Sequence, residues 1–424
     1  MKALLVAAAV VAVGEARSLD LSGWVALALQ NSPALTGADA SVSLAEAGME
    51  SARSALLPSV TLGASAGHDW TSDRTFGNFD DESYSASISL SQELLASGGS
   101  SWIDLASSRR SREAAEADLE ATRLQLELDV SSAFYDVVGA IELLSSTQAA
   151  LARSESQLEK TQALYDLGAA TSLELVQAQV SESRDRLTVA QQQQALQSSY
   201  SQLYFAAGMG GSDEQILVDT AAVLEPLTPE EAQAFEVDLS GNPSLQASGF
   251  RVDATRLSLS SARRSYWPSL SASASWSWNS NRFRPDYIPD EDSWSVQARM
   301  SWPLFDGWLR ESRIHSASAS VLSSESSLRA LENQLAANLS DARNALLTSV
   351  DSYSLAKLSL EYASRQLELS QMNYELGGLS LLDLLQAQAA LAEAEASVVS
   401  ARVDCLKAEA RLCVLAGRSP RLGE

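Results

Sequence analysis

The sequence predicts an α+β fold in which very long antiparallel helices carry short strands, with the whole arrangement built twice along the chain. Three observations lead to this prediction. Sequence fragments recur about 210 positions apart, four stretches alternate between serine and apolar residues, and two runs of about 70 residues contain no proline. Helices of that length, about 100 Å, fit no compact globular core.

An internal repeat organises the chain. Pro33-Ala34-Leu35 recurs as Pro243-Ser244-Leu245, and Tyr165-Asp166-Leu167-Gly168 recurs as Tyr374-Glu375-Leu376-Gly377. The segment between the copies is rich in glycine and acidic residues, which is typical of a linker. The expected divisions are a first repeat over 17–208, a linker in the middle of the helical rod over 209–228, a second repeat over 229–417 and a C-terminal tail over 418–424.

The first residues have the pattern of a secretory signal peptide. Lys2 supplies a positive charge, an unbroken apolar run covers Ala3–Val13, and small residues precede a cleavage site after Ala16. The apolar run is too short to span a bilayer as a helix. We therefore expect residues 1–16 to be a signal peptide; the alternative is a buried N-terminal helix of a cytosolic protein.

Each repeat begins with a helix that ends at a proline and continues into two strands. The helices are expected over about 34–56 and 244–266, ahead of Pro58 and Pro268. Strict alternation of serine with apolar residues then predicts the strands. Their expected ranges are 58–70 and 83–92 in the first repeat and 268–278 and 293–303 in the second. The polar segments 71–82 and 279–292 are expected to be exposed loops that join the strand pairs.

The remainder of each repeat predicts a very long helix, a tight turn and a second helix of about 35 residues. No proline occurs between Gly99 and Leu167, where the one glycine is Gly139, and neither proline nor glycine occurs between Gly307 and Leu376. Residues with high helix propensity dominate both runs. Glycine-containing turns follow at 168–171 and 377–380.

The strands indicate a barrel shared between chains. Each has one serine face and one apolar face over about ten residues, the length that a tilted strand needs to cross a bilayer. Four strands cannot close a barrel, and an open edge in lipid would leave backbone groups unpaired. Three copies would supply a shared 12-stranded β-barrel, four strands from each chain, closed as a symmetric ring. The alternative is a soluble, serine-rich sandwich whose apolar face is buried against a helix.

Aromatic residues near the strand ends favour the membrane interpretation, because they lie where an interfacial belt would be expected. These membrane-interface aromatics are Trp70, Tyr84, Trp276, Trp278, Trp294 and Trp302.

Composition and motifs argue against several functional classes. The 54 acidic and 30 basic side chains give a net charge of −24, which is unfavourable for a nucleic-acid partner. The chain contains no CxxC, HExxH, GxxxxGK[ST] or GxSxG motif, so we expect no enzyme, no cofactor and no metal site. Cys405 and Cys413 are two helical turns apart, about 12 Å, which is too far for a disulfide within one chain.

Several motifs together resemble one known family, the TolC-like outer-membrane efflux proteins. They are the Ala-Arg-x-x-x-x-Pro-Ser junctions that end at Ser59 and Ser269, and the segment Trp302-Pro303-Leu304-Phe305-Asp306-Gly307 ahead of a long helix. The Tyr-x-x-Gly turns at Gly168 and Gly377 belong to the same resemblance. They are followed by Leu173-Glu174-Leu175 and Leu382-Asp383-Leu384, and then by Gln-Ala-Gln in each repeat. The first repeat departs from the pattern at 91–95, where Pro-Leu-Phe is absent.

The resemblance implies a homotrimeric channel-tunnel in the cell outer membrane that extends into the periplasm as a long α-helical coiled-coil barrel. Its implied function is the passive outer-membrane channel of a tripartite efflux or type I secretion system. The implied partners are a periplasmic adaptor (membrane fusion) protein, an inner-membrane transporter and outer-membrane lipid. The alternative is a periplasmic coiled-coil scaffold or interaction protein, which explains the helices and the repeat but not the strands.

The resemblance also implies functional residues at the two tip turns. Acidic residues that line a periplasmic constriction would correspond to Asp383 and Glu174, and Gln386 stands where a second acid can follow. The alternative for both acids is helix capping, since Thr171-x-x-Glu174 and Ser380-x-x-Asp383 have the shape of capping boxes. The expected adaptor contacts are Leu167, Gly168, Ala169, Leu376, Gly377 and Gly378; the turn glycines alternatively only permit a positive φ.

Overall fold

A computed structural model describes residues 18–73, 77–210, 216–220, 225–235, 238–280 and 292–421. The expected signal peptide over 1–16 lies outside these residues. The chain forms two compact units. Unit 1 comprises Met1–Gly37, Glu120–Pro243 and Asn333–Glu424, and unit 2 comprises Ala38–Leu119 and Ser244–Glu332. Each unit therefore contains segments of both sequence repeats.

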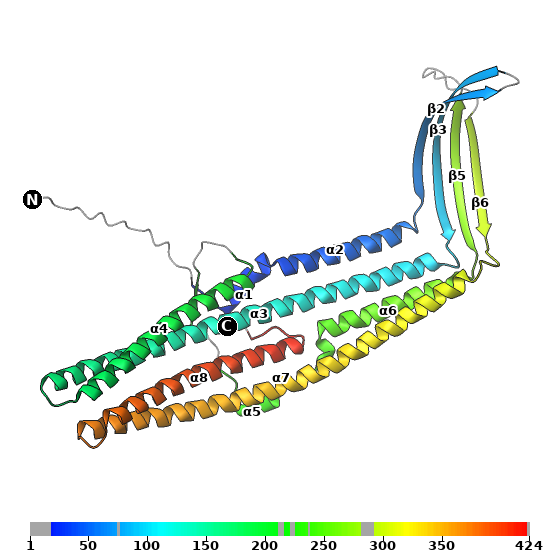
Figure 1. The fold of residues 1–424 in the computed structure, drawn as a ribbon. Coiled ribbons are helices and arrows are strands. Elements are labelled where there is room, and N and C mark those ends of the chain that lie inside the picture. Colours follow the sequence, from blue (N-terminus) through cyan, green and yellow to red (C-terminus); the bar gives the residue numbers. More distant parts are fainter. Residues whose placement is uncertain are drawn as a thin grey trace, which may run out of the picture. The chain divides into compact units, whose positions relative to one another are not determined.

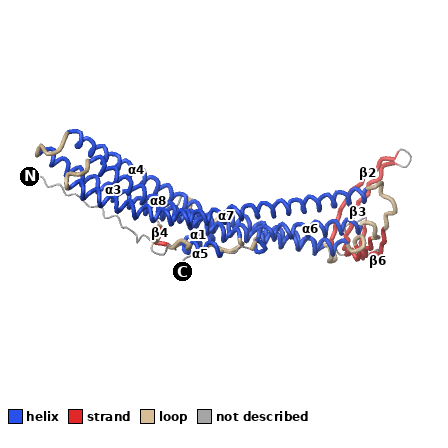
Figure 2. The backbone as a smooth tube through the Cα atoms, turned by 90° about the horizontal axis from the view of Figure 1, so that it is seen from below, coloured by secondary structure: helices blue, strands red, loops and turns tan. Residues whose placement is uncertain are grey.

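Unit 2 contains an antiparallel sheet of four strands (Figure 1), coloured red in Figure 2. The strands are β2 (Ser59–Asp73), β3 (Gly77–Leu95), β5 (Ser269–Ser280) and β6 (Asp292–Ser301), in the spatial order β2-β3-β5-β6. Neighbouring strands alternate in direction, so the two edge strands β2 and β6 run in opposite directions. Two repeats thus contribute one hairpin each to a single sheet.

The first hairpin is longer than the sequence predicts. Its strands cover Ser59–Asp73 and Gly77–Leu95 instead of 58–70 and 83–92, and the register pairs Thr71 with Phe79 and Asp73 with Gly77. The expected loop over 71–82 was wrong for most of its length. A backbone ladder does not require apolar alternation, so polar residues extend the hairpin beyond the alternating segment.

In the second hairpin, β6 ends at Ser301 and not at residue 303 as the sequence predicts. Pro303 has no backbone N–H to donate to a ladder. The indole Nε1 of Trp302 instead donates to the Tyr266 carbonyl oxygen at 3.1 Å. Residues 281–291 of the loop expected over 279–292 lie outside the described residues, while Asn279 and Ser280 belong to β5.

Long helices connect these strands to the rest of the chain. Two helices lead into the hairpins, α2 (Pro33–Ser54) and α6 (Pro243–Arg264), and two follow them, α3 (Ser100–Asp166) and α7 (Leu309–Glu375), each 67 residues long. The return helices are α4 (Ser172–Ala206) and α8 (Leu381–Leu415), each of 35 residues. Among the residues that the structure describes, no helix is both long and apolar enough to cross a membrane.

Unit 1 also contains small elements that the sequence patterns did not predict. They are α1 (Leu21–Asn31), α5 (Pro229–Ala234), the 3-10 turn η1 (Leu239–Gly241), and a parallel pair of two-residue strands, β1 (Ser18–Leu19) and β4 (Leu217–Val218). The expected linker is therefore partly ordered, because its β4 residues pair with β1. The Tyr204 hydroxyl of α4 also holds it, because it donates to the Ile216 carbonyl oxygen at 2.9 Å and accepts from the Ile216 N–H at 2.8 Å.

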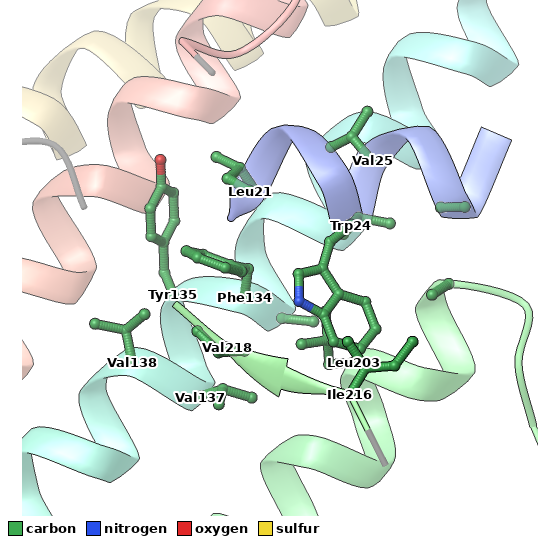
Figure 3. Close-up of a cluster of buried hydrophobic side chains, with 14 of the residues drawn as sticks. Leu21, Trp24, Val25, Phe134, Tyr135, Val137, Val138, Leu203, Ile216 and Val218 are labelled. Atoms are coloured by element: carbon green, nitrogen blue, oxygen red, sulfur yellow. The ribbon is translucent and has the colours of Figure 1, made fainter. Parts of the chain in front are cut away.

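The largest hydrophobic cluster of unit 1 surrounds Trp24 of α1 (Figure 3). The Trp24 side chain is completely buried among Phe134, Leu203 and Ile216, and its ring meets Tyr204 edge to face at 5.5 Å. The cluster thereby joins α1, α3, α4 and the β1–β4 pair.

The lone glycine of α3 marks a close approach between α3 and α8. A Cβ atom on Gly139 would lie 2.8 Å from Cγ2 of Val403, so glycine lets the two helices pack closely. Ion pairs flank this contact: Arg402 Nη1 lies 2.7 Å from Glu142 Oε1, and Lys407 pairs with Asp136. The first and second repeats are thus joined within unit 1.

Both cysteines of α8 are buried free thiols. Burial raises the pKa of Cys413 to about 11, which keeps the thiol protonated and unreactive. Cys405 packs in a second cluster with Leu346 and Leu412. The two residues therefore serve as small core side chains.

Candidate functional site

Two turns close the helical hairpins of unit 1, at the end of the unit where α3 meets α4 and α7 meets α8 (Figures 1 and 2). After α3, the N–H of Ala169 donates to the Leu164 carbonyl at 2.8 Å, and after α7 the N–H of Gly378 donates to Asn373 at 2.9 Å. Gly168 and Gly377 have φ of +75° and +73°, a conformation in which a side chain is strained. The glycines are thus required by the turns.

Two leucines project from these turns. Leu167 is 82% exposed and Leu376 is 79% exposed, and each immediately precedes the turn glycine. The other residues expected to contact an adaptor, Gly168, Ala169, Gly377 and Gly378, are also exposed. The single chain therefore presents one unpartnered leucine on each tip, next to backbone that is free of large side chains.

Glu174 forms a complete capping box at the start of α4. The Thr171 N–H donates to Oε2 of Glu174 at 2.7 Å, and the Glu174 N–H donates to Oγ1 of Thr171 at 3.2 Å. These hydrogen bonds from the Thr171 backbone and hydroxyl lower the pKa of Glu174. The carboxylate is thus held ionised at the helix N-terminus, where it also complements the helix dipole.

Replacing Thr171 by alanine should destabilise the first tip by about 1 kcal/mol at pH 7, because it removes the hydroxyl that accepts from the Glu174 N–H and donates to the Glu174 carboxylate, while the backbone N–H of residue 171 remains. The folded-state pKa of Glu174 is lowered. The bond from the Thr171 hydroxyl to the Glu174 carboxylate therefore stabilises the fold above the ordinary carboxyl pKa, and this stabilisation is lost as pH falls through the folded-state pKa. The difference in melting temperature from the wild type should therefore shrink at pH 3. An equal difference at both pH values would contradict the role of the carboxylate.

Asp383 occupies the corresponding position of α8 with a simpler cap. The Asp383 N–H donates to Oγ of the N-cap residue Ser380 at 3.3 Å, and the Ser380 hydroxyl donates to Oδ2 of Asp383 at 2.6 Å. Asp383 and Gln386 are exposed, whereas Leu381 and Leu384 are buried on the opposite face of the same turns. The structure thus places Asp383 and Gln386 side by side on one solvent face.

Within the described residues, no hydrogen bond or ion pair joins Glu174 to Asp383. The two hairpins are instead held together by an apolar cluster that includes Ala178, Leu367 and Leu381, and by a contact of 3.4 Å between Lys160 Nζ and Glu375 Oε1. Sequence reasoning missed this ion pair because its partners lie in different repeats. The described residues contain no group of three or more His, Cys, Asp or Glu side chains that could hold a metal ion.

The sheet of unit 2 has two chemically distinct faces. On one face, serine hydroxyls pair across neighbouring strands at 2.7–2.9 Å, in pairs such as Ser65 with Ser85 and Ser277 with Ser293. The other face carries the apolar residues, and the register sets Leu62 opposite Ile88 and Ile88 opposite Trp276. Many of these apolar side chains are exposed in the single chain, so this face lacks a partner within it.

The expected interface aromatics lie at both ends of this sheet. Trp70, Tyr84, Trp276, Trp278 and Trp294 lie toward the hairpin ends of the strands, and Trp302 lies at the opposite end, just beyond β6. Three exposed aromatic residues accompany Trp302 and were not among the aromatics expected at the membrane interface: Trp267, Phe305 and Trp308. Their signal was present in the segments Tyr266-Trp267-Pro268 and Trp302–Trp308, which each combine aromatics with a proline.

Curated relatives share most of the chain. It is 26% identical over 382 residues to the outer membrane protein TolC of Vibrio cholerae, covering 89% of this chain and 86% of the relative. It is 28% identical to the pyoverdine export outer membrane protein OpmQ of Pseudomonas aeruginosa, covering 93% and 84%. The alkaline protease secretion protein AprF of the same organism is 27% identical, with 95% and 85% covered.

Solved structures share the fold. The outer membrane protein VceC of Vibrio cholerae superposes with a TM-score of 0.80 at 18% identity, covering 95% of this chain and 97% of VceC. The CmeC outer membrane channel of Campylobacter jejuni gives the same TM-score and identity, with 95% and 87% covered. The family model of outer membrane efflux proteins matches residues 24–209 and 237–418. The chain belongs to the outer membrane efflux protein family and is an outer-membrane channel protein of the kind used in efflux and type I secretion.

Proposed function

We propose that three copies of the chain close one 12-stranded barrel and together form a single conduit. The observation that supports this proposal is the four-stranded sheet, whose edge strands β2 and β6 each pair with one neighbour among the described residues. Because β2 and β6 run in opposite directions, β6 of one copy is oriented to pair antiparallel with β2 of the next. Three such joints leave no open edge in the membrane.

In this assembly the apolar face meets lipid and the serine face lines the lumen. The aromatic residues support the placement, since Trp267 lies two residues before β5 and Trp276 lies nine residues further on, toward the hairpin end of this strand. Nine residues span about 30 Å along a strand, or about 23 Å of height at a tilt of about 40°. That height agrees with the apolar band of about 25 Å that is typical of outer-membrane barrels.

The trimer would conduct cargo passively from an inner-membrane transporter, reached through a periplasmic adaptor that docks on the two tips. The exposed Leu167 and Leu376 would be anchors for the adaptor. The cargo would be selected by the transporter, in keeping with relatives named for the export of a small molecule and of a protease. A periplasmic scaffold is disfavoured, because it would leave the apolar face of the sheet in water.

Electrophoresis of the outer-membrane fraction tests the trimer. Unheated samples should contain a species of three chains that heating converts to single chains. A protein found only in the soluble periplasmic fraction as a monomer or dimer would support the scaffold instead.

We further propose that Asp383 lines the constriction at the periplasmic end, with Gln386 beside it. Both side chains are exposed on one face of α8, and the buried residues Leu381 and Leu384 fix that face away from the hairpin core. Three Asp383 carboxylates gathered on the trimer axis would attract divalent cations. Glu174 would act mainly as a cap, because its carboxylate is already committed to Thr171.

Replacing Asp383 by asparagine should relieve block of the channel by divalent cations, with about a tenfold rise in the blocking concentration, because the ring of charge is lost. Asparagine preserves the size of the side chain and a hydrogen-bond acceptor for Ser380. Single-channel recording in planar bilayers measures the block. The matched control is Gln386→Ala, which removes an uncharged neighbour and should leave the block unchanged. Equal block in wild-type and Asp383→Asn channels would refute the assignment.

A further inference from the structure

A cavity of 380 Å³ lies in unit 2, where β6 leads into α7. Its walls include the rings of Tyr266, Trp302 and Trp308, and it also contains Arg310 and Glu311. Two hydrogen bonds hold the walls in place: Trp302 Nε1 donates to the Tyr266 carbonyl at 3.1 Å, and the Tyr266 hydroxyl donates to Oε1 of Glu311 at 2.8 Å. The aromatic walls of the cavity are therefore held in place, and the Glu311 carboxylate is hydrogen-bonded to one of them.

The one guanidinium in this lining is already satisfied by the protein. Arg310 is 7% exposed, and its Nε donates to Oδ2 of Asp306 at 3.0 Å while its Nη2 donates to the Leu304 carbonyl at 3.2 Å. The Arg310 backbone N–H also donates to Asp306, at 3.2 Å, so the carboxylate caps the start of α7. Asp306, Arg310 and Glu311 together carry a net charge of −1, which favours a cation over an anion.

The backbone at the rim of the cavity is strained at Trp308, whose indole is exposed there. Trp308 has a φ of +70°, which is unfavourable for a bulky residue, and follows Gly307 at +68°. The residue is 69% exposed, and its ring stands edge to face with Phe305, with ring centroids 6.4 Å apart. A strained residue that holds an exposed aromatic ring beside a cavity points to ligand binding.

The first repeat shows that the fold itself does not need this arrangement. The equivalent turn, 209 positions earlier, has Gly98 at φ +68° and Gly99 at +87°, so glycine occupies the position of Trp308. Asp306, Arg310 and Glu311 correspond there to Ser97, Ser101 and Trp102. The charged aromatic cavity is therefore special to the second repeat.

We propose that this cavity binds the ammonium headgroup of a membrane phospholipid. Aromatic faces attract a cation, and the ring of Tyr266 already does so for Arg310, whose Cζ lies 4.8 Å from the ring centroid. The carboxylate of Glu311 supplies the opposite charge. The cavity lies beside Trp267 and Trp302, at the end of the sheet where the apolar face stops. The proposal rests on the proposed membrane placement of that face, since the lipid must reach the cavity from the bilayer.

Native mass spectrometry of the detergent-purified protein, with phosphatidylethanolamine or phosphatidylglycerol added in turn, tests this assignment. We expect phosphatidylethanolamine to be retained about tenfold more tightly than phosphatidylglycerol, at up to one molecule per chain. Trp308→Gly, which installs the residue of the first repeat and relieves the strained φ, should lower that retention about tenfold. Glu311→Gln removes the negative charge without changing the size of the side chain, and it should also lower that retention about tenfold.

The matched control is Trp102→Ala, which removes an exposed indole at the position of the first repeat that corresponds to Glu311 and should leave lipid retention unchanged. Equal retention of the two lipids, or unchanged retention in both cavity variants, would overturn the proposal. A conducting trimer that retains neither lipid would also overturn it while leaving the proposed function intact. A protein that fails to insert in membranes would instead overturn the proposed function.

Discussion

Replacing Val296 by arginine should prevent the chain from assembling in the outer membrane. Val296 lies in β6 on the apolar face of the sheet and is 83% exposed in the single chain. If this face meets lipid, a charged side chain there costs about 2–4 kcal/mol in each copy near the midplane, and the trimer bears that cost three times. The amount of heat-modifiable trimer in the outer-membrane fraction should fall to near zero.

The neighbouring residue provides a matched control. Gln297 lies on the serine face of the same strand, two positions from the native Arg299 on that face. Gln297→Arg adds the same side chain to the proposed lumen, where water solvates it, so assembly should be close to normal. If the two variants assemble equally well, the assignment of faces to lipid and lumen is wrong.

Replacing Trp24 by alanine should destabilise unit 1 by about 3–5 kcal/mol, the usual cost of deleting a large buried aromatic side chain. Trp24 is completely buried and joins α1 to Leu203 and to Ile216 beside β4. Thermal unfolding followed by circular dichroism measures the loss. Detachment of α1 should also release the segment at Ile216, which limited proteolysis would detect.

The conservative variant Trp24→Phe separates packing from hydrogen bonding. Among the described residues, the indole Nε1 of Trp24 is buried without a hydrogen-bond partner, so phenylalanine loses ring volume but no hydrogen bond. Trp24→Phe should therefore lower the free energy of unfolding clearly less than Trp24→Ala does, and it should keep the edge-to-face contact with Tyr204. Equal losses of stability in Trp24→Phe and Trp24→Ala would show that packing of the aromatic ring does not stabilise this cluster.

The strands and long helices were predictable because their signals are local. Serine alternates with apolar residues wherever the sheet has two different environments, and the backbone register confirms that the alternating residues share a face. Helix runs free of proline predicted α3 and α7 within one or two residues at their ends. The family resemblance was confirmed by the family match over 24–209 and 237–418.

What the sequence did not predict depends on contacts between distant segments. The parallel pair of Ser18–Leu19 with Leu217–Val218 joins residues about 200 positions apart, and two-residue strands carry no periodicity. The helix Leu21–Asn31 is short, and its burial reflects packing against α3 and α4. The hairpin continued past Trp70 because its ladder is backbone pairing, which polar residues permit.

The candidate site likewise has some features that local sequence signals predict and others that depend on contacts between distant segments. The capping box of Glu174 follows from Thr171 three residues before it, and the structure contains both reciprocal bonds. The turn glycines likewise adopt the positive φ that their position suggested. The cavity around Trp308 was hidden, because it brings together Tyr266 and Glu311, which are 45 residues apart. Whether Asp383 lines a constriction depends on neighbouring copies and stays a prediction.

Counting the chains in a conducting channel tests whether three copies share one barrel. One detergent-purified preparation would be weighed by native mass spectrometry and then inserted into planar bilayers for single-channel recording. We expect a complex of three chains and a steady, cation-preferring conductance. A monomer or dimer without conductance would contradict the shared barrel.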